Sequence, residues 1–192
     1  MYYSLLFRIW HWLHAFVVLA LLATVLLRKT FLSYRQNSEI IIQKLADFQI
    51  TISQDQAILI AKTIRAEMWQ WHIYFGYALA FLLLFRLILV FTNSKPKEKF
   101  NSLALHKKLV QISYYLIYGV LGFMAISGFA IYFYIDLGFT KDFAKSLKDI
   151  HELAFNFVLY FSLIHIAGVI IAELREEKGI ISRMIHGKNI SI

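Results

Sequence analysis

Four long stretches of this chain contain no charged residue, and this feature limits the folds open to it. Each has roughly the 20 residues that a helix needs to cross the hydrocarbon core of a membrane: residues 9–27, 68–85, 109–135 and 153–172. Hydrophobic residues make up 59% of the 192, which is more than an ordinary soluble domain contains. A soluble helical bundle would show a polar face along each helix. We therefore predict an all-α integral membrane protein.

The predicted protein is a single transmembrane domain over residues 1–192. Its spans are expected at approximately 6–28, 68–92, 105–135 and 148–173.

Lysines and arginines near the span ends predict which side of the membrane each loop faces. The compact loop between the second and third spans, TNSKPKEKFNSLALHKK, has five lysines against one acid. Because the number of spans is even, this loop and both termini share one side, which we predict to be the cytoplasm. The net charge of +8 is then explained by topology and by attraction to anionic lipid. No nucleic-acid partner is expected.

The loop between the first two spans, residues 34–67, is predicted to be extracytoplasmic and helical. SEIIIQKLADF and SQDQAILIAKTIRAEMW both have the pattern of amphipathic helices, and Ser53 with Gln56 matches a capping box. The second helix is expected to run directly into the second span at Trp69. Two roles are open for these helices. They lie on the outer membrane surface or cap the bundle, or they form a docking platform for an external partner.

The chain has no cysteine, which excludes iron–sulfur clusters and covalently attached c-type haem. It has seven histidines, and an ionisable side chain inside a membrane is costly and therefore a candidate for function. On the fourth span, His151 and His165 are 14 residues apart. At about 100° per residue they lie within about 40° of one face, separated by about 21 Å along the axis. One helix thus presents an imidazole near each side of the membrane.

Depth in the membrane pairs these two histidines with two others. His72 lies just inside the outer start of the second span, at the depth of His151. His11 lies near the cytoplasmic start of the first span, at the depth of His165. The expected arrangement is two histidine pairs, stacked across the membrane. His14, one turn after His11 and about 60° around the helix, is a rival for the inner position.

Two facing imidazoles with few other polar groups favour haem b. Zinc usually takes four ligands, with cysteine or carboxylate among them, and a proton relay would use acids, which the four stretches lack. Haem b takes an axial ligand on each side of its ring, in the core of a helix bundle. Glycines near the histidines either make room for the ring or allow close helix packing: Gly76, Gly119, Gly122, Gly128 and Gly168.

Two arginines are predicted to bind the same cofactor through its propionates. Arg86 follows His72 by 14 residues, which places it at the depth of the inner histidine pair. Arg8 lies one turn before His11. The alternative for each is that the long side chain simply reaches water at the membrane end.

These motifs, in this order, resemble those of the bacterial cytochrome b561 and hydrogenase-type cytochrome b family of four-helix diheme membrane proteins. RIWHWLHA is similar to the first-helix motif of that family, in which the ligand corresponds to His11 rather than His14. WHIYFGYALAFLLLFR resembles the second-helix motif, with His72 as ligand and Arg86 in its usual place.

The resemblance continues through the second half of the chain. LHKKLVQISYYLIYGVLGFMAISGF is similar to the ligand-free third helix, and IHELAFNFVLYFSLIHIAGVI to the fourth helix, with His151 and His165 as ligands. The tail ISRMIHGKN also resembles the end of the family. The long first loop departs from the short members, which leaves partner and substrate open.

The resemblance implies a four-helix bundle in a bacterial inner (cytoplasmic) membrane, with two b haems stacked across it. The implied function is electron transfer between the quinone pool and an extracytoplasmic donor or acceptor, with quinone as substrate or bound ligand. In one version the chain alone resembles a superoxide:quinone oxidoreductase. In another it resembles the cytochrome b subunit of a hydrogenase or dehydrogenase, which serves an extracytoplasmic redox protein. A haem-free membrane scaffold is the alternative from a different class.

Overall fold

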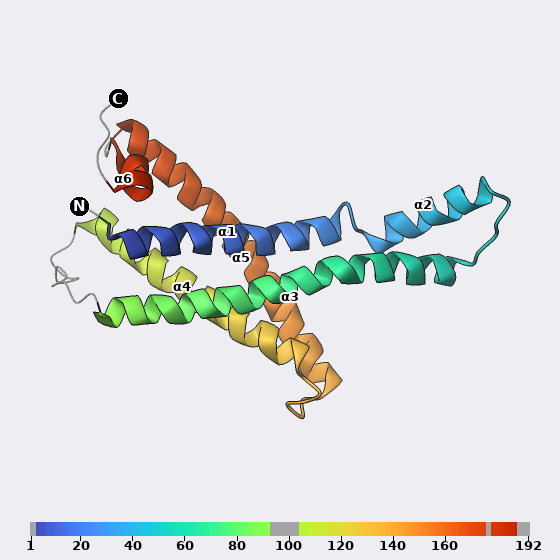
Figure 1. The fold of residues 1–192 in the computed structure, drawn as a ribbon. Helices are drawn as coiled ribbons and strands as arrows, with labels where there is room; N and C mark the ends of the chain where they lie inside the picture. The colour runs from blue at the N-terminus through green and yellow to red at the C-terminus, as the bar shows by residue number, and fades with distance from the viewer. Residues whose placement is uncertain (1–2, 93–103, 176–177, 188–192) are drawn as a thin grey trace. The chain divides into compact units, whose positions relative to one another are not determined.

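A computed structural model describes residues 3–92, 104–175 and 178–187. These residues form helices joined by short links, and no strand occurs in them, so the predicted all-α class is confirmed. The helices in Figure 1 are α1 (Leu5–Lys29), α2 (Tyr34–Ala46), α3 (Gln54–Thr92), α4 (Leu105–Tyr132), α5 (Lys141–Arg175) and α6 (Ile180–His186).

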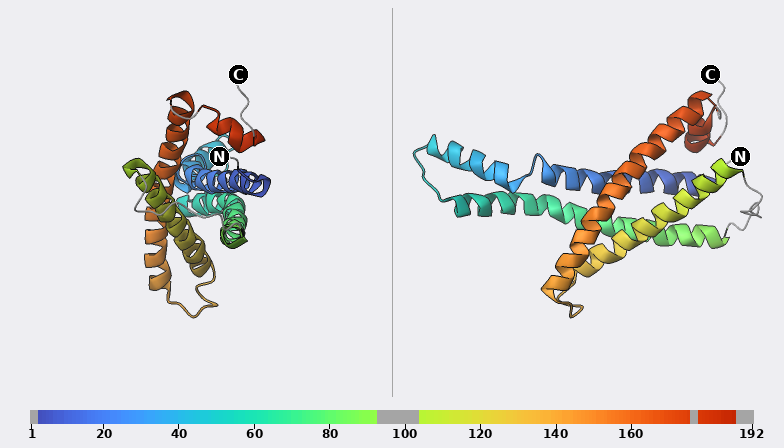
Figure 2. Two further views of the ribbon diagram at one scale, coloured as in Figure 1. Left: turned by 90° about the vertical axis from the view of Figure 1, so that its left-hand side faces the viewer. Right: turned by 180° about the vertical axis from the view of Figure 1, so that it is seen from behind.

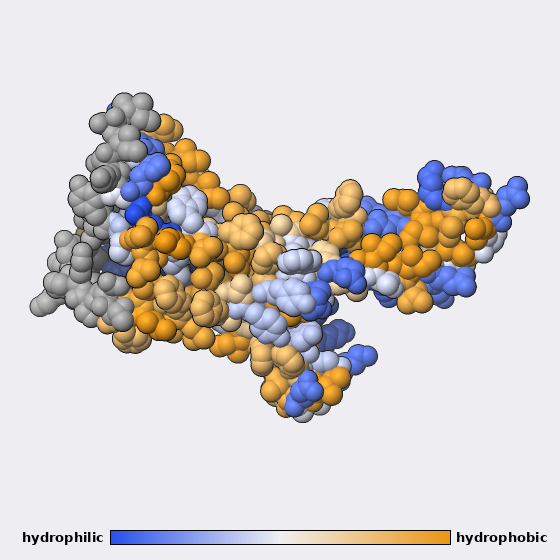
Figure 3. Space-filling model, in the orientation of Figure 1, coloured by the Kyte–Doolittle hydropathy of each residue, from blue (hydrophilic) through white to orange (hydrophobic). Residues whose placement is uncertain are grey.

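Four of these helices are long and apolar enough to cross a membrane, as predicted: Leu5–Lys29, Gln54–Phe91, Lys108–Tyr132 and Lys141–Arg175. Apolar side chains cover most of the visible faces of α1 and α3 (Figure 3), and many are exposed, such as Phe81 at 67%. Such faces suit contact with lipid. Lys95, Lys97 and Lys99 of the basic loop used to predict orientation lie outside the described residues.

The helices α3 and α5 begin well before their predicted spans, at Gln54 and Lys141. The absence of charge marks the part of a helix that lies in hydrocarbon, whereas the helix itself continues wherever its backbone hydrogen bonds continue. Sequence patterning therefore located the spans better than it located the helix ends.

The chain divides into two compact units. The larger unit contains Met1–His14 and Leu79–Ile192, and the arm unit contains Ala15–Ala78. The helices α1 and α3 each contribute one segment to each unit.

In the arm unit, α3 runs antiparallel to the second half of α1, and α2 lies beside the beginning of α3 (Figures 1 and 2). Ser38 of α2 is fully buried and accepts a hydrogen bond from the side chain of Gln54 at 3.2 Å. Ala57 and Ala61 are 0% and 1% exposed. Their small side chains allow the two helices to approach closely.

The start of α3 has the predicted capping box. The Ser53 backbone N–H donates to Gln56 Oε1 at 2.8 Å, and the Gln56 backbone N–H donates to Ser53 Oγ at 3.2 Å. From there α3 runs through Trp69 without a break, as predicted. Its first half therefore cannot lie flat on a membrane that its second half crosses. At 39 residues the helix is about 58 Å long, roughly twice the thickness of the hydrocarbon core.

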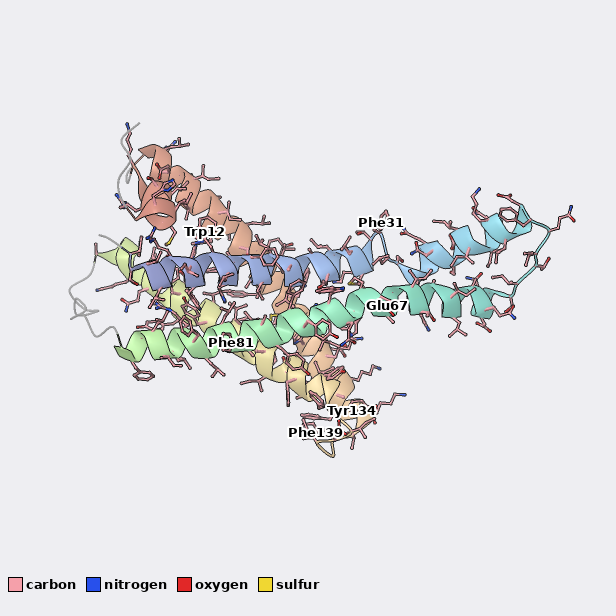
Figure 4. All side chains as sticks on the ribbon, in the orientation of Figure 1. Trp12, Phe31, Glu67, Phe81, Tyr134 and Phe139 are labelled. Atoms are coloured by element: carbon pink, nitrogen blue, oxygen red, sulfur yellow. The ribbon has the colours of Figure 1, made fainter. Side chains whose placement is uncertain are left out.

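Basic side chains on α3 hold the beginning of α2. Lys62 Nζ and Arg65 Cζ lie 5.3 and 5.0 Å from the centre of the Tyr34 ring. These are distances at which a cation is attracted to an aromatic face. Phe31, in the link between α1 and α2, is 78% exposed and points away from the helices (Figure 4).

In the larger unit, α4 and α5 are antiparallel neighbours joined by a tight turn (Figure 2). Gly138 has a φ of +71° in this turn, a conformation that favours glycine. The Phe139 N–H closes the turn on the Tyr134 carbonyl at 2.8 Å.

The C-terminal helix α6 returns to the beginning of α1. Glu173 accepts hydrogen bonds from the backbone N–H groups of Gly179 and Ile181, at 2.8 and 2.9 Å. Trp12 Nε1 donates to the Met184 carbonyl at 3.2 Å (Figure 4). The helix α6 thereby packs beside the first turns of α1.

Candidate functional site

His11 on α1 and His165 on α5 meet in the larger unit. Their ring centres lie 6.4 Å apart, with the ring planes at 63°. A metal–nitrogen bond of about 2 Å on each side, plus about 1 Å from nitrogen to ring centre, places two axial imidazoles about 6 Å apart. The spacing of the two rings therefore fits a metal ion held between them.

Aromatic side chains line this pair. Phe161, one turn before His165, stacks on its ring with planes at 5° and centres 6.2 Å apart. Phe7, one turn before His11, lies 6.4 Å from it with planes at 27°. The rings are thus held in an apolar, aromatic environment, which suits a large flat cofactor.

His14 packs elsewhere. Its ring stacks on Trp10 at 4.9 Å with planes at 16°, and Trp10 Nε1 donates to the Leu82 carbonyl of α3 at 2.8 Å. The structure thus brings His11, and not its rival His14, against His165.

Three buried side-chain nitrogens of the described residues have no hydrogen-bond partner: Arg8 Nε, His14 Nδ1 and Arg86 Nε. Buried polar atoms are almost always satisfied in folded proteins, so each exception needs an explanation. All three belong to the larger unit, and the two arginines carry positive charge. An anionic group bound beside either arginine would satisfy its Nε, and the propionates of haem are such groups.

Arg86 lies against the turn of α1 that precedes His11. Its guanidinium carbon is 4.9 Å from the centre of the Phe7 ring and 5.1 Å from that of Trp10. This is the neighbourhood in which the sequence placed it.

Arg8 has a second neighbour that sequence reasoning did not foresee. Its Nη1 donates to the carbonyl of Ile185 in α6 at 2.8 Å. A Cβ at Gly187, where φ is +78°, would come within 2.9 Å of the Arg8 Cζ. Part of this guanidinium therefore holds the C-terminal segment, and its other N–H groups are donors for a ligand.

In the arm unit, His72 of α3 contacts Thr24 of α1. The distance from His72 Nδ1 to Thr24 Oγ1 is 2.7 Å. The His72 ring also stacks on Trp69, with centres 4.6 Å apart and planes at 4°. The Cζ atom of Arg28 lies over the Trp69 ring, 5.4 Å from its centre.

In the larger unit, His151 of α5 contacts Ser127 of α4 in the same way. The distance from His151 Nδ1 to Ser127 Oγ is 2.8 Å. Gly128 follows Ser127, and a Cβ there would lie 3.4 Å from His151 Cε1. His72 and His151 belong to different units.

Three glycines of the larger unit have open space where a side chain would lie. Within the larger unit, a Cβ at Gly119, Gly122 or Gly168 would meet no atom within 4 Å. Close helix packing inside that unit therefore does not explain these three residues.

Sequence reasoning missed Thr24 and Ser127, although a signal was present. Thr24 is the only serine or threonine in residues 9–27, and Ser127 lies near the C-terminal end of its span. Each is a hydroxyl at the depth of a histidine on a following helix. Matching hydroxyls to histidines by depth, as histidines were matched to each other, would have found both.

The residues present fit haem better than a metal ion alone. Among the residues that the structure describes, no three histidine, aspartate or glutamate side chains gather to hold a metal ion. A pair of facing histidines, aromatic walls and arginines with buried, unpartnered Nε atoms, on helices able to cross a membrane, are features of a b-type membrane cytochrome.

The comparison with known families agrees: the chain belongs to the prokaryotic cytochrome b561 family, which it matches over residues 2–187. The resemblance that the motifs indicated is thus confirmed. The protein is a multi-pass membrane cytochrome of the diheme electron-transfer type, and the family implies a four-helix bundle with haem b. Comparisons with curated proteins and with solved structures gave no match.

Proposed function

We propose that this chain carries electrons across a bacterial inner membrane, between the quinone pool and a donor or acceptor at the outer face. His11 and His165 are the ligands of an inner haem, and His72 and His151 are the ligands of an outer one. The observation that carries the proposal is the 6.4 Å separation of the His11 and His165 rings, which joins residues from opposite ends of the chain at a metal-binding distance.

The outer assignment has two supports. His72 and His151 lie at the same predicted depth, and each has the same contact, an Nδ1 within 2.8 Å of a buried hydroxyl. Metal-binding histidines commonly donate their second ring N–H to such a partner. Two histidines on different helices thus have the same kind of contact at the same predicted depth. This is what we expect if both bind one haem.

The chain's own residues have distinct roles in this proposal. The four histidines bind iron, and Arg86 with Arg8 neutralises the propionates of the inner haem through donors that include the two unpartnered Nε atoms. Haem b, when bound, supplies the one-electron chemistry. The apolar helices exclude water around it, which strengthens the electrostatic interactions of these arginines.

The orientation belongs to the same proposal. Both termini face the cytoplasm, and residues 34–67 face the opposite side. The support is the excess of lysine in the loop between the second and third spans.

The structure of the arm favours a protein partner over a small molecule alone as the outer redox partner. The helix α2 and the first half of α3 are held together by the Ser38–Gln54 hydrogen bond and by the cations around Tyr34. An ordered helical pair beyond the span is suited to docking a protein. A chain that exchanges electrons with superoxide alone has no evident need for one.

The first experiment is a haem assay with a redox titration of the purified protein. Two b haems per chain, with two midpoint potentials, are expected. Oxidation of the reduced protein by a short-chain quinone in lipid vesicles is expected to be fast. His186→Ala, a substitution in α6, is the matched control and should leave both haems in place. One haem or none would overturn the diheme assignment, and no reaction with quinone would overturn the quinone assignment.

The partner is tested separately. If the outer redox partner is a protein, a protein that contains haem or another redox centre should copurify with the intact chain. It should no longer copurify when residues 34–67 are replaced by a short linker. If superoxide generated in the vesicle medium reduces the haems of the isolated chain at full rate, the superoxide version is supported instead.

A further inference from the structure

The two histidines proposed for the outer haem share a contact that the inner pair lacks. His72 Nδ1 lies 2.7 Å from the Thr24 hydroxyl, and His151 Nδ1 lies 2.8 Å from the Ser127 hydroxyl. The contacts lie in different units and on different pairs of helices. In the part of the chain that the structure describes, the ring nitrogens of His11 and His165 have no hydrogen bond.

The hydrogen of each hydroxyl already has an acceptor in the backbone. Thr24 Oγ1 donates to the Leu21 carbonyl at 2.7 Å, and Ser127 Oγ donates to the Met124 carbonyl at 3.3 Å. A hydroxyl group has one hydrogen and two lone pairs. Each oxygen therefore accepts a hydrogen bond from the imidazole, and Nδ1 carries the proton in both rings.

This arrangement determines which ring nitrogen binds a metal. A neutral imidazole with its proton on Nδ1 has its lone pair on Nε2. Thr24 is 6% exposed and Ser127 is 2% exposed, so water does not compete for the Nδ1 hydrogen. A hydrogen bond to this position also limits ring rotation and makes the imidazole a stronger ligand.

We infer that Thr24 and Ser127 are positioning residues for the outer haem, each accepting a hydrogen bond from a ligand histidine and so presenting Nε2 to the iron. This inference rests on the proposed role of His72 and His151 as ligands. A stronger imidazole donor stabilises the ferric state of the iron relative to the ferrous state. Loss of either hydroxyl therefore raises the midpoint potential of the outer haem.

The test uses substitutions that remove only the hydroxyl from the full-length protein. Thr24→Val and Ser127→Ala are each expected to shift the outer midpoint potential upward and to alter the low-spin EPR signal of the outer haem. The inner haem should keep its potential and its signal. Thr24→Ser and Ser127→Thr retain a hydroxyl and are expected to restore wild-type values.

Two matched controls test whether any lost hydroxyl has this effect. Thr30 Oγ1 and Ser113 Oγ donate to the carbonyls of Leu26 and Val110, each at 2.8 Å. Thr30 directly follows α1, the helix of Thr24, and Ser113 lies on α4 with Ser127. Thr30→Val and Ser113→Ala should leave both haems unchanged. An equal shift in these controls, or in the hydroxyl-retaining variants, would overturn the inference.

An unchanged outer potential and EPR signal in Thr24→Val and Ser127→Ala would also overturn it. If either variant fails to accumulate, cysteine at that position provides a weaker acceptor, and the same upward shift is expected; its absence counts against the inference. His72→Ala and His151→Ala separate the two proposals. If they retain both haems, the ligand assignment and the inference fail together. If they lose the outer haem while the hydroxyl variants show no shift, only the positioning role fails.

Discussion

The inner and outer histidines of this cytochrome are held in different ways. His72 and His151 each have a ring nitrogen hydrogen-bonded to a buried hydroxyl. His11 and His165 are instead enclosed by aromatic rings, close to arginines whose buried Nε atoms lack partners. A hydrogen bond fixes the tautomer and direction of an imidazole, whereas stacking fixes only its plane. The arginines also place positive charge near the inner pair, which the hydrogen bonds to hydroxyls do not provide.

The difference implies that substitutions have separate effects at the two sites. Changes in charge should act on the inner haem, and changes in hydrogen bonding on the outer one. The following predictions proceed from the largest expected effect to the smallest.

Removal of a ligand should have the largest effect. His72→Ala and His151→Ala should each remove the same outer haem, and His11→Ala and His165→Ala the inner one, so that about half of the bound haem is lost in each variant. Pyridine haemochrome assays and low-temperature spectra measure this. If His72→Ala and His151→Ala lost different spectral components, the two histidines would not share one haem, and the division into an inner and an outer site would be wrong.

The inner site can be tested more sharply with His14. Because its ring stacks on Trp10 and not on His165, His14→Ala should retain both haems, with at most a small spectral shift. His11→Ala on the same helix is the matched comparison. Retention of the inner haem in His11→Ala and its loss in His14→Ala would assign the ligand to His14.

Arg86→Gln should lower the midpoint potential of the inner haem, because removal of a cation disfavours the added electron. The expected change is about 1 kcal/mol, or about 40 mV for a one-electron couple, because the propionate already neutralises part of the charge. The outer haem should move much less, since it lies about a Debye length or more away. Arg86→Lys keeps the charge and is the control. Unchanged potentials with full haem occupancy would mean that Arg86 only reaches the membrane surface.

Arg8→Gln should give the smallest shift of the inner potential, in the same direction. Its Nη1 is occupied by the Ile185 carbonyl, so less of its guanidinium is available to a propionate. The same substitution should loosen α6, which limited proteolysis of the C-terminal segment measures. A larger shift than that of Arg86→Gln would reverse the ranking of the two arginines.

Sequence alone predicted the parts of this protein that depend on local pattern. Uncharged stretches gave the four spans, helical periodicity gave the shared face of His151 and His165, and the Ser53–Gln56 pair gave the start of α3. It did not predict the contact of Arg8 with Ile185, 177 residues away, because no periodic pattern connects two chain ends. Thr24 and Ser127 were missed because a hydroxyl in an apolar helix usually bonds its own backbone, and both do so while also lying within hydrogen-bond distance of a histidine.

The helix α3 also makes a mechanical connection. His72 follows Gln54 by 18 residues of unbroken helix, a distance of about 27 Å, and helices bend only gently where no proline or bulge interrupts them. A continuous helical segment therefore connects the start of α3 to His72 and to the contact of His72 with Thr24. If a protein docks on α2 and the first half of α3, and His72 binds the outer haem, as we propose, then docking should shift the spectrum of that haem without any contact between the partner and the haem.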